Sequence, residues 1–136
     1  MKYEFEVPGK VIGKGRPRLN TYTGIVYTPT RTKDYETLVE QYFLLKYPKF
    51  KALEGRIKVS ITAYFSIPKA TKKSDINEMM ENNISPTKKP DIDNIVKVVL
   101  DSMNKFAFKD DNQITKLEVE KKYGLEEKIY IKIEEY

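Results

Sequence analysis

The strict alternation of apolar and polar residues from position 57 to position 65 constrains the fold of this chain more than any other feature. Apolar side chains occupy every second position, at Ile57, Val59, Ile61, Ala63 and Phe65. A period of two places one set of side chains on a single face of a β-strand. This segment therefore predicts a strand with one face on an apolar core and the other in solvent.

Shorter segments repeat the pattern. Residues 2–7 and 128–134 alternate in the same way, and residues 115–120 predict a fourth strand with Leu117 and Val119 facing the core. Gly124 lies between the last two segments, so it predicts a turn that joins them as an antiparallel hairpin.

Two segments follow the helical period instead. Residues 35–42 place apolar side chains at i, i+3, i+4 and i+7, and Thr32 is the predicted N-cap of this helix. The second helix follows Pro90, with an apolar face of Ile92, Ile95, Val96, Val99, Leu100 and Met103. Two main helices and four strands predict an α+β fold with a small mixed or antiparallel sheet, in a single domain of residues 1–136.

Composition limits the chemistry. The chain contains no cysteine and no histidine, which excludes thiolate metal sites, Ser-His-Asp triads and imidazole bases. Lys and Arg number 25 against 20 Asp and Glu, and this excess favours polyanionic partners such as nucleic acid. No apolar run is long enough to span a membrane and no signal-peptide pattern opens the chain. We therefore expect a cytoplasmic protein without membrane contact.

The segment from position 89 to position 113 carries the residues best suited to catalysis. Its charged candidates are Asp91, Asp93, Lys97, Asp101, Asp110 and Asp111. If the strand after Asp111 packs beside the start of the second helix, the carboxylates converge. A site of oxygen ligands suits Mg²⁺ or Mn²⁺, which could activate water and stabilise charge on a phosphate. Lys97 could contact that phosphate.

The same residues have ordinary structural explanations. Asp91 suits a helix N-cap, Asp93 and Lys97 suit an i, i+4 ion pair, and Asp110-Asp111 suits a turn. The spacing alone leaves a metal site and these structural roles both open.

Basic residues cluster in two irregular segments. Residues 8–33 contain no acidic residue, and residues 67–90 are rich in lysine. The candidates for contacts with DNA phosphates are Lys10, Lys14, Arg16, Arg18, Lys88 and Lys89. Lysines more often lie on a solvated surface, so charge alone leaves this contact open as well.

Three short motifs favour the functional interpretation of these residues over the structural one. The segments from Pro90 to Lys97 and from Asp110 to Gln113, with Gly15-Arg16-Pro17-Arg18 upstream, resemble the RusA family of Holliday junction resolvases. These are small endonucleases, often encoded by phages or prophages. The resemblance covers nearly the whole chain and implies a RusA-like fold.

The resemblance also implies roles for individual residues. Asp91, Asp93 and Asp111 match the essential acidic residues that bind Mg²⁺, and Lys97 matches the catalytic lysine of the family. Asp110 is the neighbouring position and a further candidate ligand.

The implied activity is that of a homodimer that nicks two opposed strands of a four-way DNA junction, in recombination and repair. Two alternatives stay open, namely a non-catalytic nucleic-acid-binding module and a related metal nuclease acting on flaps or other branched DNA. Residues 69–89 follow no family pattern, so they predict no sequence preference.

Overall fold

The most strictly alternating segment becomes a central strand of the sheet. In the computed structural model, which describes residues 1–136, β4 (Ile57–Ser66) buries every second residue. β4 pairs antiparallel with β6 (Lys128–Glu135) and parallel with β5 (Ile114–Gly124). β1 (Lys2–Pro8) pairs antiparallel with β6, so the strand order is β1-β6-β4-β5. The predicted α+β fold with a mixed sheet is confirmed.

The predicted hairpin between the last two strands is wrong. β5 and β6 lie on opposite sides of β4, and the short connection between them crosses the end of that strand. A Cβ atom on Gly124 would lie 3.0 Å from the Tyr64 ring, so the missing side chain permits this close crossing. The Ser66 hydroxyl donates to the Glu127 carboxylate at 3.1 Å and so ties the connection to the end of β4. As an edge strand, β5 also leaves Leu117 exposed, although the alternation predicts that it faces the core.

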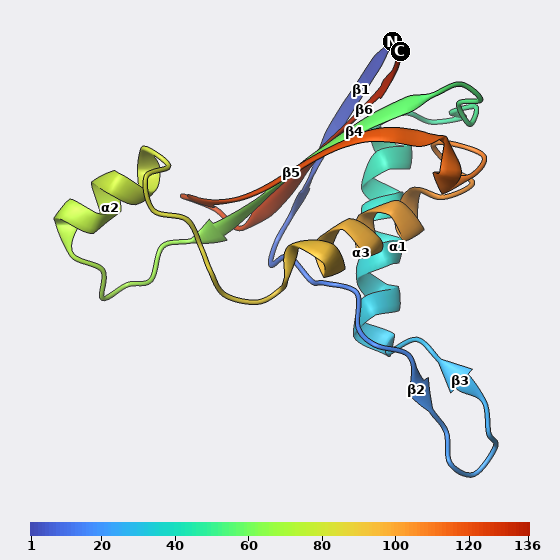
Figure 1. Cartoon of the computed structure of the whole chain (residues 1–136), viewed down its shortest axis with the longest axis horizontal. Helices are drawn as coiled ribbons and strands as arrows, with labels where there is room; N and C mark the ends of the chain where they lie inside the picture. The colour runs from blue at the N-terminus through green and yellow to red at the C-terminus, as the bar shows by residue number, and fades with distance from the viewer.

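Two helices cover one face of the sheet (Figure 1). α1 (Thr30–Lys46) and α3 (Ile92–Met103) pack against each other, and α1 also contacts β1. The buried face of α3 includes Ile95, Val99 and Met103 as predicted, but Val98 replaces Ile92, which is exposed. The core therefore lies between the helices and the inward face of the sheet.

The start of α1 differs from its predicted start. Pro29 occupies the N-cap position, and Thr32 lies inside the helix, where it is buried. The Thr32 hydroxyl accepts a hydrogen bond from the backbone N–H of Gly15 at 2.9 Å. A tertiary contact therefore uses the oxygen that the local pattern assigned to capping.

Two segments project from this body (Figure 1). One is a hairpin of β2 (Arg18–Leu19) and β3 (Val26–Tyr27). The other contains α2 (Lys73–Met80), which has no buried residue and lies beside β5. None of the helices is both long and apolar enough to cross a membrane.

The sheet face opposite α1 and α3 carries several lysines and glutamates among hydroxyl and tyrosine side chains. They pair across the strands, as in the 3.1 Å contact between Lys58 and Glu118 and the 3.0 Å contact between Lys128 and Glu6. This outer face is therefore balanced in charge, and the basic surplus that would attract a polyanion lies elsewhere.

Candidate active site and DNA-binding surface

The start of α3 presents two carboxylates that make no side-chain hydrogen bond or ion pair within the chain. Asp91 is the N-cap residue, but its side chain makes no capping hydrogen bond. Its backbone carbonyl accepts instead from the N–H groups of Asn94 and Ile95, both at 3.1 Å. Asp93 lies in the first turn and is exposed. Both carboxylates are free to bind a ligand at the positive end of the helix dipole.

Lys97 lies one turn further along α3. Its side chain is exposed, and none of the ion pairs in the molecule includes Lys97, Asp91 or Asp93. The i, i+4 pair that offered an ordinary explanation for Asp93 and Lys97 is therefore absent.

Asp101, by contrast, has a clear structural partner. The Lys14 ammonium lies 3.0 Å from the Asp101 carboxylate and 3.1 Å from that of Glu36. Partial burial opposes the charge on Lys14, but hydrogen bonds to the two carboxylates outweigh it and raise the pKa of Lys14. Through Lys14, this bridge joins α1 and α3 to the basic segment of residues 8–33. The charge of Lys14 is compensated, so it is the least available of the predicted phosphate contacts.

Of the two adjacent residues Asp110 and Asp111, only Asp110 has a structural partner. Asp110 caps a 3₁₀ turn, η1 (Asp111–Gln113), by accepting from the N–H of Asn112 at 3.0 Å, while the Gln113 side chain accepts from the N–H of Asp110 at 2.9 Å. The Asn112 N–H lowers the pKa of Asp110. The Asp110 carboxylate in turn raises the pKa of Asp111, with a smaller contribution from Asp101. The negative charge of Asp111 is thus opposed by neighbouring carboxylates, chiefly that of Asp110.

The structure does not bring the three predicted metal ligands together. Asp111 shares a cleft of about 300 Å³ with Leu100 and Ile114, toward the far end of α3 from Asp91 and Asp93. The rise of an α-helix puts Asp93 and Asp101 about 12 Å apart. Accordingly, no group of three or more carboxylates is close enough to hold one ion. The reason is that β5 begins at Ile114, which shares the cleft with Leu100 in the second half of α3.

Five of the six predicted phosphate contacts line one cavity of about 660 Å³, together with Arg31, Asp91 and Asn94. The five are Lys10, Lys14, Arg16, Arg18 and Lys89. The sixth, Lys88, lies outside, with its ammonium 5.8 Å from the centre of the Phe65 ring. The cavity places a concentration of positive charge directly beside a candidate catalytic carboxylate.

Close backbone contacts fix this arrangement. The N–H of Lys14 donates to the carbonyl of Asn94 at 2.9 Å. A Cβ atom on Gly13 would lie 2.7 Å from the Pro90 side chain, so only glycine allows the basic segment to approach α3 this closely. Arg31 was not among the predicted site residues, although it stands in the same acid-free segment and comes at the start of α1.

The comparison with known proteins agrees with this arrangement of motifs. The family model described as Endodeoxyribonuclease RusA matches residues 8–134. The chain belongs to the RusA endodeoxyribonuclease family. It is similar to a Bacillus subtilis (strain 168) protein named "Uncharacterized protein YqaN", with 32% identity over 136 residues, covering 97% of this chain and 95% of the relative. The resemblance drawn from residues 90–113 and 15–18 is confirmed.

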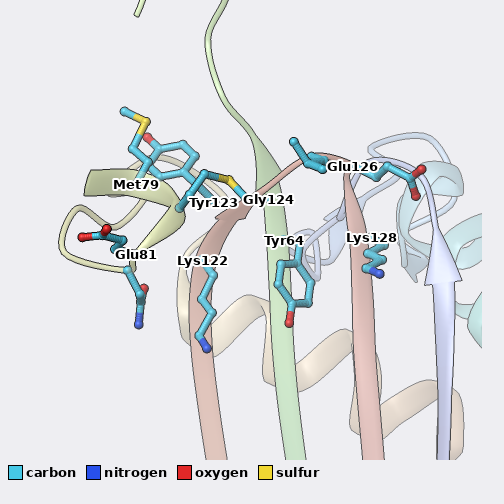
Figure 2. Close-up of a pocket in the computed structure, with 11 residues that line it drawn as sticks. Tyr64, Met79, Glu81, Lys122, Tyr123, Gly124, Glu126 and Lys128 are labelled. Atoms are coloured by element: carbon cyan, nitrogen blue, oxygen red, sulfur yellow. The ribbon is translucent and has the colours of Figure 1, made fainter. Parts of the chain in front are cut away.

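A second cavity of this RusA-family chain, of about 740 Å³, lies where the connection between β5 and β6 crosses the sheet (Figure 2). Figure 2 shows Tyr64, Lys122 and Lys128 reaching it from the sheet, with Met79 and Glu81 on the side of α2. None of the family motif residues lines it, and its charges are of both signs. It is therefore separate from the candidate active site.

Proposed function

We propose that this chain is a Mg²⁺-dependent endonuclease that resolves four-way DNA junctions, with Mn²⁺ as a substitute ion. One observation carries the proposal, namely the uneven use of the acidic residues in the family motif. Asp101 and Asp110 have structural partners in Lys14 and in the η1 backbone. The remaining acidic residues, Asp91, Asp93 and Asp111, make no ion pair and cap no helix or turn with their side chains.

The chemistry of the donors fits the proposed cation, although the structure holds Asp111 apart from Asp91 and Asp93. Asp91, Asp93 and Asp111 offer only oxygen ligands, which Mg²⁺ prefers, and all three are exposed. When bound, such an ion supplies Lewis-acid stabilisation of phosphate charge and lowers the pKa of a water molecule. The Asp110 carboxylate already accepts the hydrogen bond that caps η1, so Asp110 is a less suitable ligand than Asp111.

The remaining residues of the site bind and orient the DNA. Arg16, Arg18 and Lys89 lie in the same cavity as Asp91, so they hold phosphates of a strand that passes the start of α3. Lys97 follows Asp93 by one turn, where its ammonium stabilises the negative charge that grows on the phosphate during attack by water.

A substrate panel tests this proposal. Four-way junctions, flaps, linear duplexes and single strands of matched sequence are incubated with the protein in Mg²⁺. We expect the junction to be cut in preference to the others. Preferred cleavage of flaps or single strands would favour the related metal nuclease, and binding without any cleavage would favour the non-catalytic module.

The arginines of the basic cavity should determine the salt dependence of DNA binding. Because each lost phosphate contact reduces the slope of log affinity against log salt by about 0.9, the Arg16→Ala, Arg18→Ala double variant should flatten it by about 1.8. Fluorescence anisotropy in Ca²⁺ measures binding apart from cleavage. A Lys2→Ala, Lys58→Ala double variant of the balanced outer face is the control. An unchanged slope in the arginine variant would remove these residues from the DNA surface.

We also propose a homodimer with twofold symmetry. Resolution of a four-way junction needs two nicks in strands of like polarity, and two identical sites related by a twofold axis supply them. Sedimentation equilibrium at micromolar concentration should give about twice the chain mass of 15.9 kDa. A strictly monomeric protein that still made paired nicks would contradict this prediction.

A further inference from the structure

The β2–β3 hairpin carries an unusual share of the exposed apolar surface. Of the 13 large apolar side chains that are exposed in the molecule, five belong to residues 18–27, namely Leu19, Tyr22, Ile25, Val26 and Tyr27. The others are spread over the rest of the chain, as is normal for a soluble surface. Figure 1 shows this hairpin extending away from α1 and the sheet. A concentration of apolar residues on a projecting arm marks a contact site.

The tip of the arm is an ordered turn. The Asn20 side chain accepts from the N–H groups of Tyr22 at 2.9 Å and Thr23 at 3.3 Å, and the Asn20 carbonyl accepts from the N–H of Gly24 at 2.8 Å. Gly24 has a φ of 70°, in the region that glycine adopts without strain. The Tyr22 side chain, which is 98% exposed, is therefore presented on a closed turn.

The charge around the arm favours nucleic acid as its partner. Arg16 and Arg18 stand at its base, Arg31 follows it at the start of α1, and all three line the basic cavity. The arm itself lies within the acid-free segment of residues 8–33. A second copy of the chain would bring an equally basic arm to the contact, whereas DNA brings phosphates and flat base surfaces.

We propose that this hairpin recognises the branch point of the DNA, with Tyr22 stacking on a base that the branch leaves uncovered. Aromatic side chains stack on exposed bases, and projecting apolar residues insert where stacking is interrupted. In the interior of a linear duplex every base is already covered on both faces, so the arm adds affinity at a branch and not along the duplex. This inference rests on the proposed function and names the feature of the substrate that the arm contacts.

Binding of two DNA probes tests the inference. One is a four-way junction with 2-aminopurine at the branch, and the other is a linear duplex of the same sequence, both titrated in Ca²⁺. Tyr22→Ala should weaken junction binding about tenfold and remove the change in 2-aminopurine fluorescence, without altering duplex binding. Tyr22→Phe keeps the ring and should behave as the wild type. Leu125→Ala removes another exposed apolar side chain, 85% exposed, and should have no effect.

Three outcomes would overturn the inference. They are an equal loss of junction and duplex binding in Tyr22→Ala, no loss at all, or a shift of that variant from dimer to monomer in sedimentation, which would assign the arm to a contact between copies. A failure of the proposed function would be distinguishable from a failure of this inference. If the wild type binds junctions through Tyr22 but cuts no DNA, the role of the arm is supported and the nuclease proposal is wrong.

Discussion

Asp93→Asn is expected to abolish Mg²⁺-dependent cleavage of a four-way junction while the protein stays folded. The substitution removes the negative charge that a cation requires but preserves the shape of the side chain. Asp93 is exposed and makes no ion pair, so its loss should change the free energy of unfolding by no more than about 0.5 kcal/mol. Denaturing gels of a labelled junction measure the cleavage, and thermal unfolding measures the stability.

Two further substitutions serve as controls for this result. Asp34→Asn changes another exposed aspartate, on α1, and should cut normally. Asp110→Asn keeps a side-chain oxygen for the η1 cap, so it should retain far more activity than Asp111→Asn. Full activity of Asp93→Asn in Mg²⁺ would show that this carboxylate binds no essential cation.

Lys97→Ala is expected to lower the cleavage rate by about 10²-fold, the scale seen when one electrostatic stabiliser of a transition state is removed. Its side chain has no partner within the chain, and this leaves the ammonium available to a reacting phosphate. Junction affinity in Ca²⁺ should change much less, because one exposed lysine contributes little to a surface with several basic residues.

Single-turnover rates at saturating protein separate this effect from binding. Lys46→Ala, which removes an exposed lysine at the end of α1, is the matched control and should cleave at the wild-type rate. A normal rate in Lys97→Ala would make Lys97 an ordinary surface residue of α3.

Alternation and helical periodicity predicted most elements of the fold, but not all of their neighbours. The alternation of residues 57–65 identified the buried face of β4, because a period of two determines which side chains share a face. It could not determine which strand pairs with which, so the crossover at Gly124 was predicted as a hairpin. The cap at Thr32 failed for a related reason, since its hydroxyl bonds to Gly15 from a distant segment.

The candidate site shows the same limit: its local spacing could be predicted from the sequence, and its long-range contacts could not. The spacing of Asp91, Asp93 and Lys97 is local, so the sequence predicted correctly that they lie at the start and in the first turns of one helix. The bridge from Lys14 to Asp101 joins distant segments and has no local signature. The same holds for the position of Asp111 near the far end of α3, which depends on where β5 enters the sheet.

The central claim, paired cleavage of a four-way junction, is tested most directly on a supercoiled plasmid that extrudes a cruciform. Two nicks in opposed strands across one junction convert the plasmid to a linear form, whereas a single nick gives an open circle. We predict linear product from the wild type in Mg²⁺, and none in EDTA. An open circle as the only product, or a plasmid that stays supercoiled in Mg²⁺ and in Mn²⁺, would contradict the claim.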